Sequence, residues 1–570
     1  MNCIKSLALA LVVVACTSVS TVSAQDDQVV ADAVYQNGVV YTVDGMRSTA
    51  EAFAVKDGKF LAVGSSDDMK AFTGSNTQVV DLGGKMVMPG LIDAHIHPVR
   101  GGLTANGVSF TSSATLEDIK NAIKEHIAST NPDPGEWIEG AKWGSALQST
   151  LTAKELDEVA PDNPVYLHDW TNHMLAVNSK ALQAAGITAD TPDPDEGKID
   201  RDSDGNPNGI LENKAASLVT NIVPPPTEAQ IRAAATTVFN NLSQYGITSI
   251  STAQLDQTRL AAYRAMELEG ELVVRIKGHW DWNTRYADVS LPEMAARFDT
   301  RDKRGPVTDL IDPDGVKIYF DGVPNGYSAP FIEPYADKPV FGTQSIDAPA
   351  AKAAVLHFDR EGLQVMMHAV GDMSVRHVLD AIESARESNP GGPRHHLAHA
   401  TWVHEGDHGR AARLNVGVEM SPWNCWAPDA GSVTFAPLVG RERIENTSPF
   451  KDMLAAGDIV CYGSDWDNVP EPDPWFAMEC TITRRNPDAP QLGQLGFKQA
   501  IDLPTAIEVF TINGAYNLGK EDITGSIEVG KSADFIVLDN NLFDIPTRRI
   551  HQVKVQQTWL QGKKVFDRNN

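Results

Sequence analysis

Short apolar runs alternate with stretches of helical periodicity along most of this chain, and this alternation constrains the fold more than any other feature. Eight apolar runs end in a polar residue or are followed directly by one, and helical stretches such as 228–242 and 348–361 lie between most of them. Strands that alternate with helices are typical of a parallel sheet covered by helices. Eight such units predict a (β/α)8 barrel, in which side chains at the carboxyl ends of the strands carry the chemistry. The expected strands are 87–97, 247–253, 272–280, 316–321, 363–368, 396–399, 416–420 and 459–465.

Short strands are also predicted at both ends of the chain, outside the barrel. Apolar or alternating runs next to glycine turns occur at 33–43, 52–63, 534–538 and 555–560. We therefore expect residues 25–86 and 525–570 to meet in one small β-sandwich domain.

One long segment interrupts the strand–helix alternation. Residues 87–524 are predicted to form the barrel, but 107–226 do not follow the pattern and contain a stretch rich in Pro and Asp. We expect this segment to be an insertion after the first strand that caps the barrel mouth.

The first 24 residues have the features of a secretory signal peptide. Lys5 precedes the apolar run 7–15, and Val-Ser-Ala at 22–24 offers a cleavage site before Gln25. The run is too short to span a bilayer, and no later stretch is long enough to be a transmembrane segment. Cys16 ends a Val-Val-Ala-Cys sequence similar to the box of bacterial lipoproteins, so a lipid anchor there is the alternative to cleavage before Gln25. Both interpretations predict an exported protein, periplasmic or secreted.

The charge balance limits the partners of the chain. The 75 Asp and Glu residues exceed the 48 Lys and Arg residues, which gives a formal net charge of −27. A nucleic acid would be repelled at long range, and no basic stripe interrupts the acidic background. We expect a small-molecule substrate and no nucleic-acid partner; a homodimer and a monomer both remain open.

Five polar residues at predicted strand ends suggest a metal site. His95 and His97 are two positions apart in a strand, so their imidazoles point to one face, as in many divalent-metal sites. A lone His-x-His pair would be a weak signal, since it also occurs as two polar residues at a strand end. Three later strands, however, end on His368, His399 and Asp465. Because barrel strands end at a common rim, we expect these side chains to share one metal site.

These motifs resemble the amidohydrolase superfamily of metal-dependent barrel hydrolases, and within it the amidohydrolase-3, or YtcJ-like, branch. The resemblance covers most of the chain in order. It is carried by PGLIDAHIH (89–97), DWTNHMLAVNSKAL (169–182), GILEN (209–213), GVKIYFDG (315–322), HAVGD (368–372), HAT (399–401), GSDWDNVP (463–470) and GKSADFIVLD (530–539).

The resemblance also implies the roles of individual residues. Asp465 matches the eighth-strand aspartate, which binds metal and shuttles a proton. His173, in the cap, is expected to contact the substrate or the oxyanion, with an uninvolved loop histidine as the alternative. The matched metal ligands are His95, His97, Lys317, His368, His399 and Asp465.

Lys317 decides how many metal ions are expected. In many relatives the matching lysine is carboxylated and bridges two metals, and we expect the same here. The alternative is a strand lysine whose amine pairs with a carboxylate such as Asp321, which would leave a single metal. Imidazole and carboxylate ligands make Zn²⁺ the expected ion.

The expected activity is hydrolysis of a C–N bond, of the amide or N-acyl type, by metal-activated water. A bound metal lowers the pKa of water to about 7, and Asp465 would pass its proton to the leaving nitrogen. Hydrolysis of an ester or a cyclic amide by the same site, or a catalytically silent barrel that only binds a ligand, are the alternatives.

Overall fold

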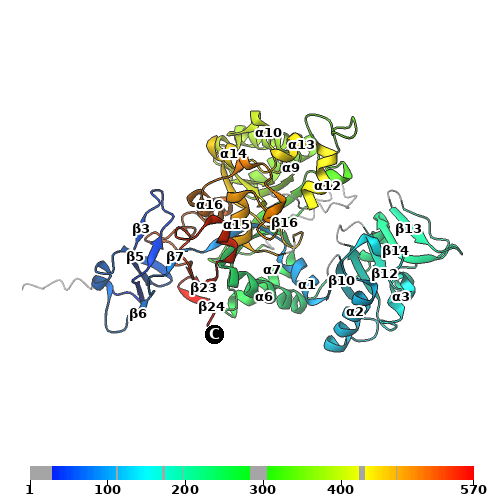
Figure 1. The fold of residues 1–570 in the computed structure, drawn as a ribbon, viewed down its shortest axis with the longest axis horizontal. Coiled ribbons are helices and arrows are strands. Elements are labelled where there is room, and N and C mark those ends of the chain that lie inside the picture. Colours follow the sequence, from blue (N-terminus) through cyan, green and yellow to red (C-terminus); the bar gives the residue numbers. More distant parts are fainter. Residues whose placement is uncertain are drawn as a thin grey trace, which may run out of the picture.

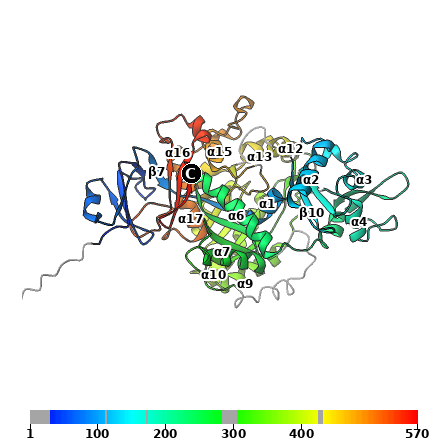
Figure 2. The same cartoon turned by 90° about the horizontal axis from the view of Figure 1, so that it is seen from below.

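The computed structural model describes residues 29–110, 113–169, 174–194, 197–282, 304–422, 430–469 and 471–569. The predicted signal segment, including Cys16 and Gln25, lies outside these residues, as does His173. The described chain is elongated, with a central barrel between a small β part built from both chain ends and the inserted cap (Figures 1 and 2).

Eight strands form the central sheet, in the order β21-β20-β19-β18-β17-β16-β15-β8, and each neighbouring pair is parallel. A parallel bridge between Ile96, in one outer strand, and Trp466, just after the other, brings the two edges of the sheet together. The predicted (β/α)8 barrel is therefore confirmed. Its strands are β8 (Leu91–Ile96), β15 (Ile247–Leu255), β16 (Arg275–Asp281), β17 (Ile311–Tyr319), β18 (Gln364–Ala369), β19 (His395–His399), β20 (Val416–Met420) and β21 (Ile459–Tyr462).

Local signals fix the helices between the strands. In α6 (Glu228–Tyr245), Thr227 and Gln230 form a capping box, and Gly246 ends the helix with a φ of 87° immediately before β15. The other helices of the barrel part are α1 (Pro98–Asn106), α7 (Gln257–Leu268), α9 (Ala348–Arg360), α10 (Asp372–Ser388), α11 (Arg410–Arg413), α12 (Ala430–Val439), α13 (Arg441–Glu445), α14 (Phe450–Ala455), α15 (Pro474–Thr483), α16 (Leu503–Phe510) and α17 (Ile512–Leu518).

The expected first strand is divided between two sheets. β7 (Met86–Pro89) pairs with β2 and β22 in the terminal β part, whereas β8 pairs with β15 in the barrel. Gly90 separates them at a point where a Cβ atom would lie 2.2 Å from Oγ1 of Thr248. The predicted boundary between the β-sandwich and the barrel, at residues 86 and 87, thus falls within a strand. The reason is that one continuous apolar run contributes side chains to two hydrophobic cores.

Strands from both chain ends share a sheet, as the terminal patterns predicted. One sheet has the order β5-β4-β1-β6, and the other has the order β24-β23-β22-β7-β2-β3. Between them the ring of Tyr35 packs edge-on against Phe535 and Trp559, with ring centres 5.1 and 5.3 Å apart. The strands are β1 (Ala33–Gln36), β2 (Val39–Tyr41), β3 (Thr49–Ala50), β4 (Ala52–Lys56), β5 (Lys59–Gly64), β6 (Gln78–Asp81), β22 (Phe535–Leu538), β23 (Val555–Leu560) and β24 (Lys563–Asp567).

The insertion after α1 has a sheet and a core of its own. Its strands follow the order β13-β14-β12-β11-β10-β9, and Trp143 is fully buried with its indole N–H donating to the Leu167 carbonyl. Figure 2 shows this cap beside the barrel, next to α1. Its elements are β9 (Val108–Ser109), α2 (Leu116–Thr130), β10 (Ile138–Trp143), α3 (Ala153–Asp157), β11 (Val165–Asp169), β12 (Met174–Val177), α4 (Ser179–Ala184), β13 (Gly197–Arg201), β14 (Pro207–Asn213) and α5 (Ser217–Thr220).

In the part of the chain that the structure describes, every helix is too short or too polar to cross a membrane.

Candidate metal centre

His95 and His97 converge on Asp465 at the rim of the barrel. His95 lies near the end of β8, and His97 follows this strand as the N-cap residue of α1. Their Nε2 atoms lie 3.7 and 3.2 Å from Oδ1 of Asp465. Both histidines are buried, whereas the Asp465 side chain is 20% exposed. The three ligand atoms are close enough together to hold one ion.

The backbone after β21 turns so that Asp465 can face the histidines. Asp465 has a φ of 55°, and its N–H donates to the carbonyl of His95 at 2.8 Å. Its Oδ1 also accepts a hydrogen bond from Nδ2 of Asn468. These two hydrogen bonds hold the Asp465 carboxylate next to β8 and leave part of it exposed.

His368 and His399 extend the same cluster. They lie at the ends of β18 and β19, and their ring centres are 4.4 Å apart. The ring of His399 is 4.6 Å from that of His95. The structure therefore brings together all four histidines that the resemblance implied as ligands.

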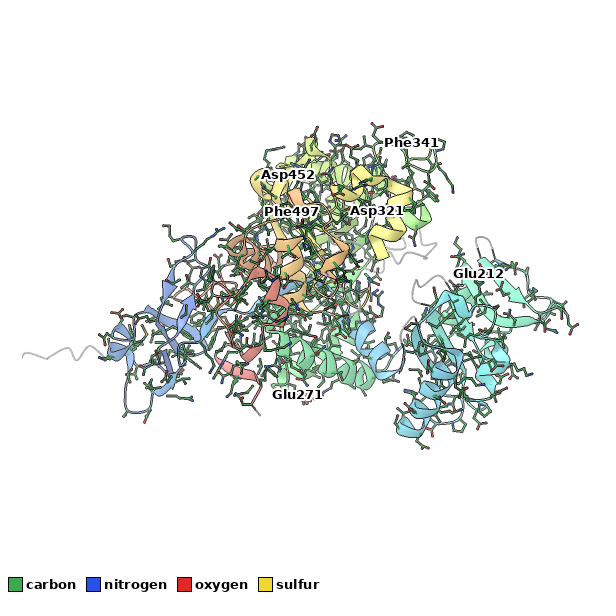
Figure 3. All side chains as sticks on the ribbon, viewed as in Figure 1. Glu212, Glu271, Asp321, Phe341, Asp452 and Phe497 are labelled. Atoms are coloured by element: carbon green, nitrogen blue, oxygen red, sulfur yellow. The ribbon has the colours of Figure 1, made fainter. Side chains whose placement is uncertain are left out.

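Lys317 points into this cluster from β17. It is fully buried, and its Nζ lies 3.3 Å from Nε2 of His95. The Asp321 carboxylate, the partner considered for this lysine, accepts hydrogen bonds from Nδ1 of His368 at 2.7 Å and from the N–H of Gly371 at 3.0 Å. Asp321 belongs to the barrel and lies two residues after the end of β17 (Figure 3).

The electrostatics of the cluster suit a divalent cation. Burial, with Lys317 nearby, lowers the pKa of His95 well below its usual value, and burial does the same for His399. Burial acts to raise the pKa of Asp465, but the hydrogen bond with His97 and the nearby His399 hold it below its usual range. Neutral imidazoles and an ionised carboxylate are the forms that bind a metal, so the donor set fits Zn²⁺ or a similar ion.

Glu419 is a buried acidic residue at this cluster that the sequence patterns did not single out. It lies on β20, its side chain is fully buried, and its Oε2 is 2.9 Å from Nδ1 of His95. Burial raises the pKa of this carboxyl to about 8. The available signal was one glutamate inside an otherwise apolar predicted strand, 416–420.

The comparisons with known proteins agree with this architecture. A sequence profile of the amidohydrolase family matches residues 78–566. The chain is 28% identical over 543 residues to the putative amidohydrolase YtcJ of Bacillus subtilis, with 94% of this chain and 100% of that protein covered. It is 27% identical to the N-substituted formamide deformylase of Arthrobacter pascens, with 94% and 98% covered.

A solved structure shares the fold. The crystal structure of an uncharacterised metal-dependent hydrolase from Pyrococcus horikoshii OT3 matches with a TM-score of 0.75 and 22% identity, covering 90% of this chain and 99% of that one. The family match over most of the sequence shows that the chain belongs to the amidohydrolase family.

Proposed function

We propose that this protein is an exported hydrolase that cleaves a C–N bond of a small molecule, of the amide or N-acyl type, with a divalent metal held by its barrel. The convergence of the His95 and His97 Nε2 atoms on the Asp465 carboxylate carries this proposal. The similarity to N-substituted formamide deformylase supports N-acyl compounds, formamides first, as the substrate class.

The proposed ligands are His95, His97, His368, His399 and Asp465, with Zn²⁺ as the ion. When bound, such an ion polarises a carbonyl and makes water acidic enough to act as a nucleophile near neutral pH. Lys317 is proposed to be carboxylated, because a bare ammonium 3.3 Å from a ligating imidazole would repel the cation. A carboxylated Lys317 would bridge a second metal ion.

Asp465 is the proposed proton shuttle. Its pKa is held below its usual range, so the carboxyl group is ionised at neutral pH. Its side chain is partly exposed while the histidines around it are buried, which gives a nucleophile and a leaving nitrogen access to the same carboxylate. The carboxyl group would take the proton from the attacking water and return it to the leaving nitrogen. His173 is proposed to hydrogen-bond the substrate from the cap.

The proposed function is tested by metal analysis combined with a substrate screen. Purified protein should contain one or two divalent ions per chain, and two would support the carboxylated Lys317. It should hydrolyse at least one formamide, N-acyl amino acid or cyclic amide, lose this activity to a chelator and regain it with Zn²⁺. Folded, metal-loaded protein that cleaves none of these compounds would contradict the proposal.

Matched variants localise the metal. His97→Asn should lower the metal content, whereas His357→Asn should not, because His357 is an exposed residue of α9 and is not one of the proposed ligands. The proposed export is tested separately by the intact mass of the mature protein, which distinguishes cleavage before Gln25 from a lipidated Cys16.

A further inference from the structure

We propose that Glu419 is a positioning residue that holds His95 and His399 in place through a single carboxylate oxygen. This inference rests on the metal site of the proposed function, and it assigns a role to a residue outside the implied ligand set. Oε2 of Glu419 lies 2.9 Å from Nδ1 of His95 and accepts the N–H of His399 at 2.9 Å. One oxygen thus connects strands β20, β8 and β19.

The two nitrogens of the His95 ring face different groups. Glu419 contacts the nitrogen that points away from the proposed metal position, so we assign it a positioning role and not that of a metal ligand. Nε2 lies 3.3 Å from Nζ of Lys317 and 3.7 Å from Oδ1 of Asp465, on the side where the cluster gathers. Nδ1 faces Glu419 instead. A ligating histidine commonly donates its second ring N–H to a carboxylate, which fixes the tautomer and the ring orientation and makes the ligand more basic. Glu419 is placed for that contact.

The contact with His399 acts on the backbone. His399 has a φ of 74°, a left-handed conformation that is costly for a residue with a side chain. The N–H of His399 is buried at this turn and needs a hydrogen-bond acceptor, which Oε2 of Glu419 provides. The carboxylate therefore favours the turn that directs the His399 ring towards His95 and His368.

The neighbouring strand leaves room for this side chain. A Cβ atom at Gly463 would lie 2.7 Å from Cγ, Cδ and Oε1 of Glu419. Gly463 follows β21 and precedes Asp465 by two residues, so the glycine that makes space for Glu419 lies in the segment that carries the proposed proton shuttle.

The test compares two buried carboxylate–histidine pairs of the same barrel. Glu419→Gln replaces the acid beside His95 by its amide. Asp359→Asn is the matched control, because Oδ2 of Asp359 is buried 3.0 Å from Nε2 of His395, at the other end of β19 from His399. Both changes replace a buried acid by its amide, but only the first touches proposed ligands.

Metal retention is measured without any substrate. The rate of metal loss to a chelator and the visible spectrum of Co²⁺-loaded protein are recorded for the parent and both variants. We expect Glu419→Gln to weaken metal binding by about 10- to 100-fold and to change the Co²⁺ spectrum, with Asp359→Asn close to the parent. Glu419→Leu, which also removes the hydrogen-bond acceptor, should lose metal faster still.

Equal retention and equal spectra in the parent and Glu419→Gln would overturn the proposal, as would an equal loss in Asp359→Asn. If Glu419→Leu does not fold, Glu419→Gln decides alone. This test measures metal binding and not hydrolysis. A parent protein that binds metal but cleaves no amide would therefore contradict the proposed function without affecting this inference.

Discussion

Oδ1 of Asp321 lies 2.7 Å from Nδ1 of His368, and the same carboxylate accepts the N–H groups of Val370 and Gly371. It therefore connects the His368 ring to the turn between β18 and α10. Nδ1 of His368 is therefore held by Asp321.

Asp321→Asn should weaken metal binding or activity by about 10- to 100-fold, because the amide holds the ring less strongly and no longer selects its tautomer. Metal titration of the purified variant measures the effect. Asp347→Asn is the control, since Asp347 caps α9 and asparagine caps a helix equally well. Unchanged metal affinity in Asp321→Asn would refute this role.

Asp465→Asn should lower kcat by about 10²- to 10⁴-fold with a much smaller change in KM, because the proton transfer is lost while substrate contacts remain. Steady-state kinetics on metal-loaded protein provide the measurement. Asp473→Asn, at the N-cap of α15, should leave kcat near the parental value. A metal-loaded Asp465→Asn protein that works at the parental rate would exclude Asp465 as the proton shuttle.

Gly101→Ala should destabilise the protein by about 1–3 kcal/mol and weaken metal binding, because the new methyl group would overpack the rim. Its Cβ would lie 2.2 Å from Cζ3 of Trp466, the residue after Asp465. Urea unfolding and metal titration test both effects. Gly45→Ala is the control, as its Cβ would have no neighbour within 4 Å; a similar result for the two variants would contradict the prediction.

Arg275→Met should lower the free energy of unfolding by about 3–5 kcal/mol, because it leaves a buried carboxylate without its cation. Nη2 of Arg275 on β16 lies 3.0 Å from Oδ2 of Asp534, just before β22, and both side chains are buried. Urea unfolding compares this variant with Lys70→Met. The ion pair of Lys70 with Asp67 is exposed, so its loss should change the free energy of unfolding little. Equal stability of the two variants would argue against the prediction.

His279 should make the fold less stable in mild acid. Burial and the nearby Lys277 lower its pKa to about 3, below the value near 6.5 of an unfolded chain. Between these values the unfolded state binds a proton that the folded state does not, so this group favours unfolding by up to about 1.4 kcal/mol per pH unit as the pH falls.

Replacing His279 by Gln should make the stability less dependent on pH below 6.5. Urea unfolding at several pH values between 7 and 5 measures the slope for the parent and for His279→Gln. Parallel stability curves for the two proteins would show that His279 does not titrate in this way.

The candidate ligands His95, His97, His368, His399 and Asp465 could be predicted from the sequence, because each one follows or ends an apolar run and parallel strands of a barrel end at one rim. The division of the run 87–97 into β7 and β8 could not be predicted. Apart from Gly90 no residue marks a break between the two halves, and the packing of two separate cores assigns them to different sheets.

The barrel and the pattern of candidate ligands could be predicted from the sequence, since they depend on periodicity and on which residues end the strands. The tertiary structure alone decided the place of Glu419. A single glutamate in a strand faces the barrel or the solvent according to register, and its contacts with His95 and His399 join residues 324 and 20 positions away. Such contacts form only when the sheet closes, so no local pattern along the chain encodes them.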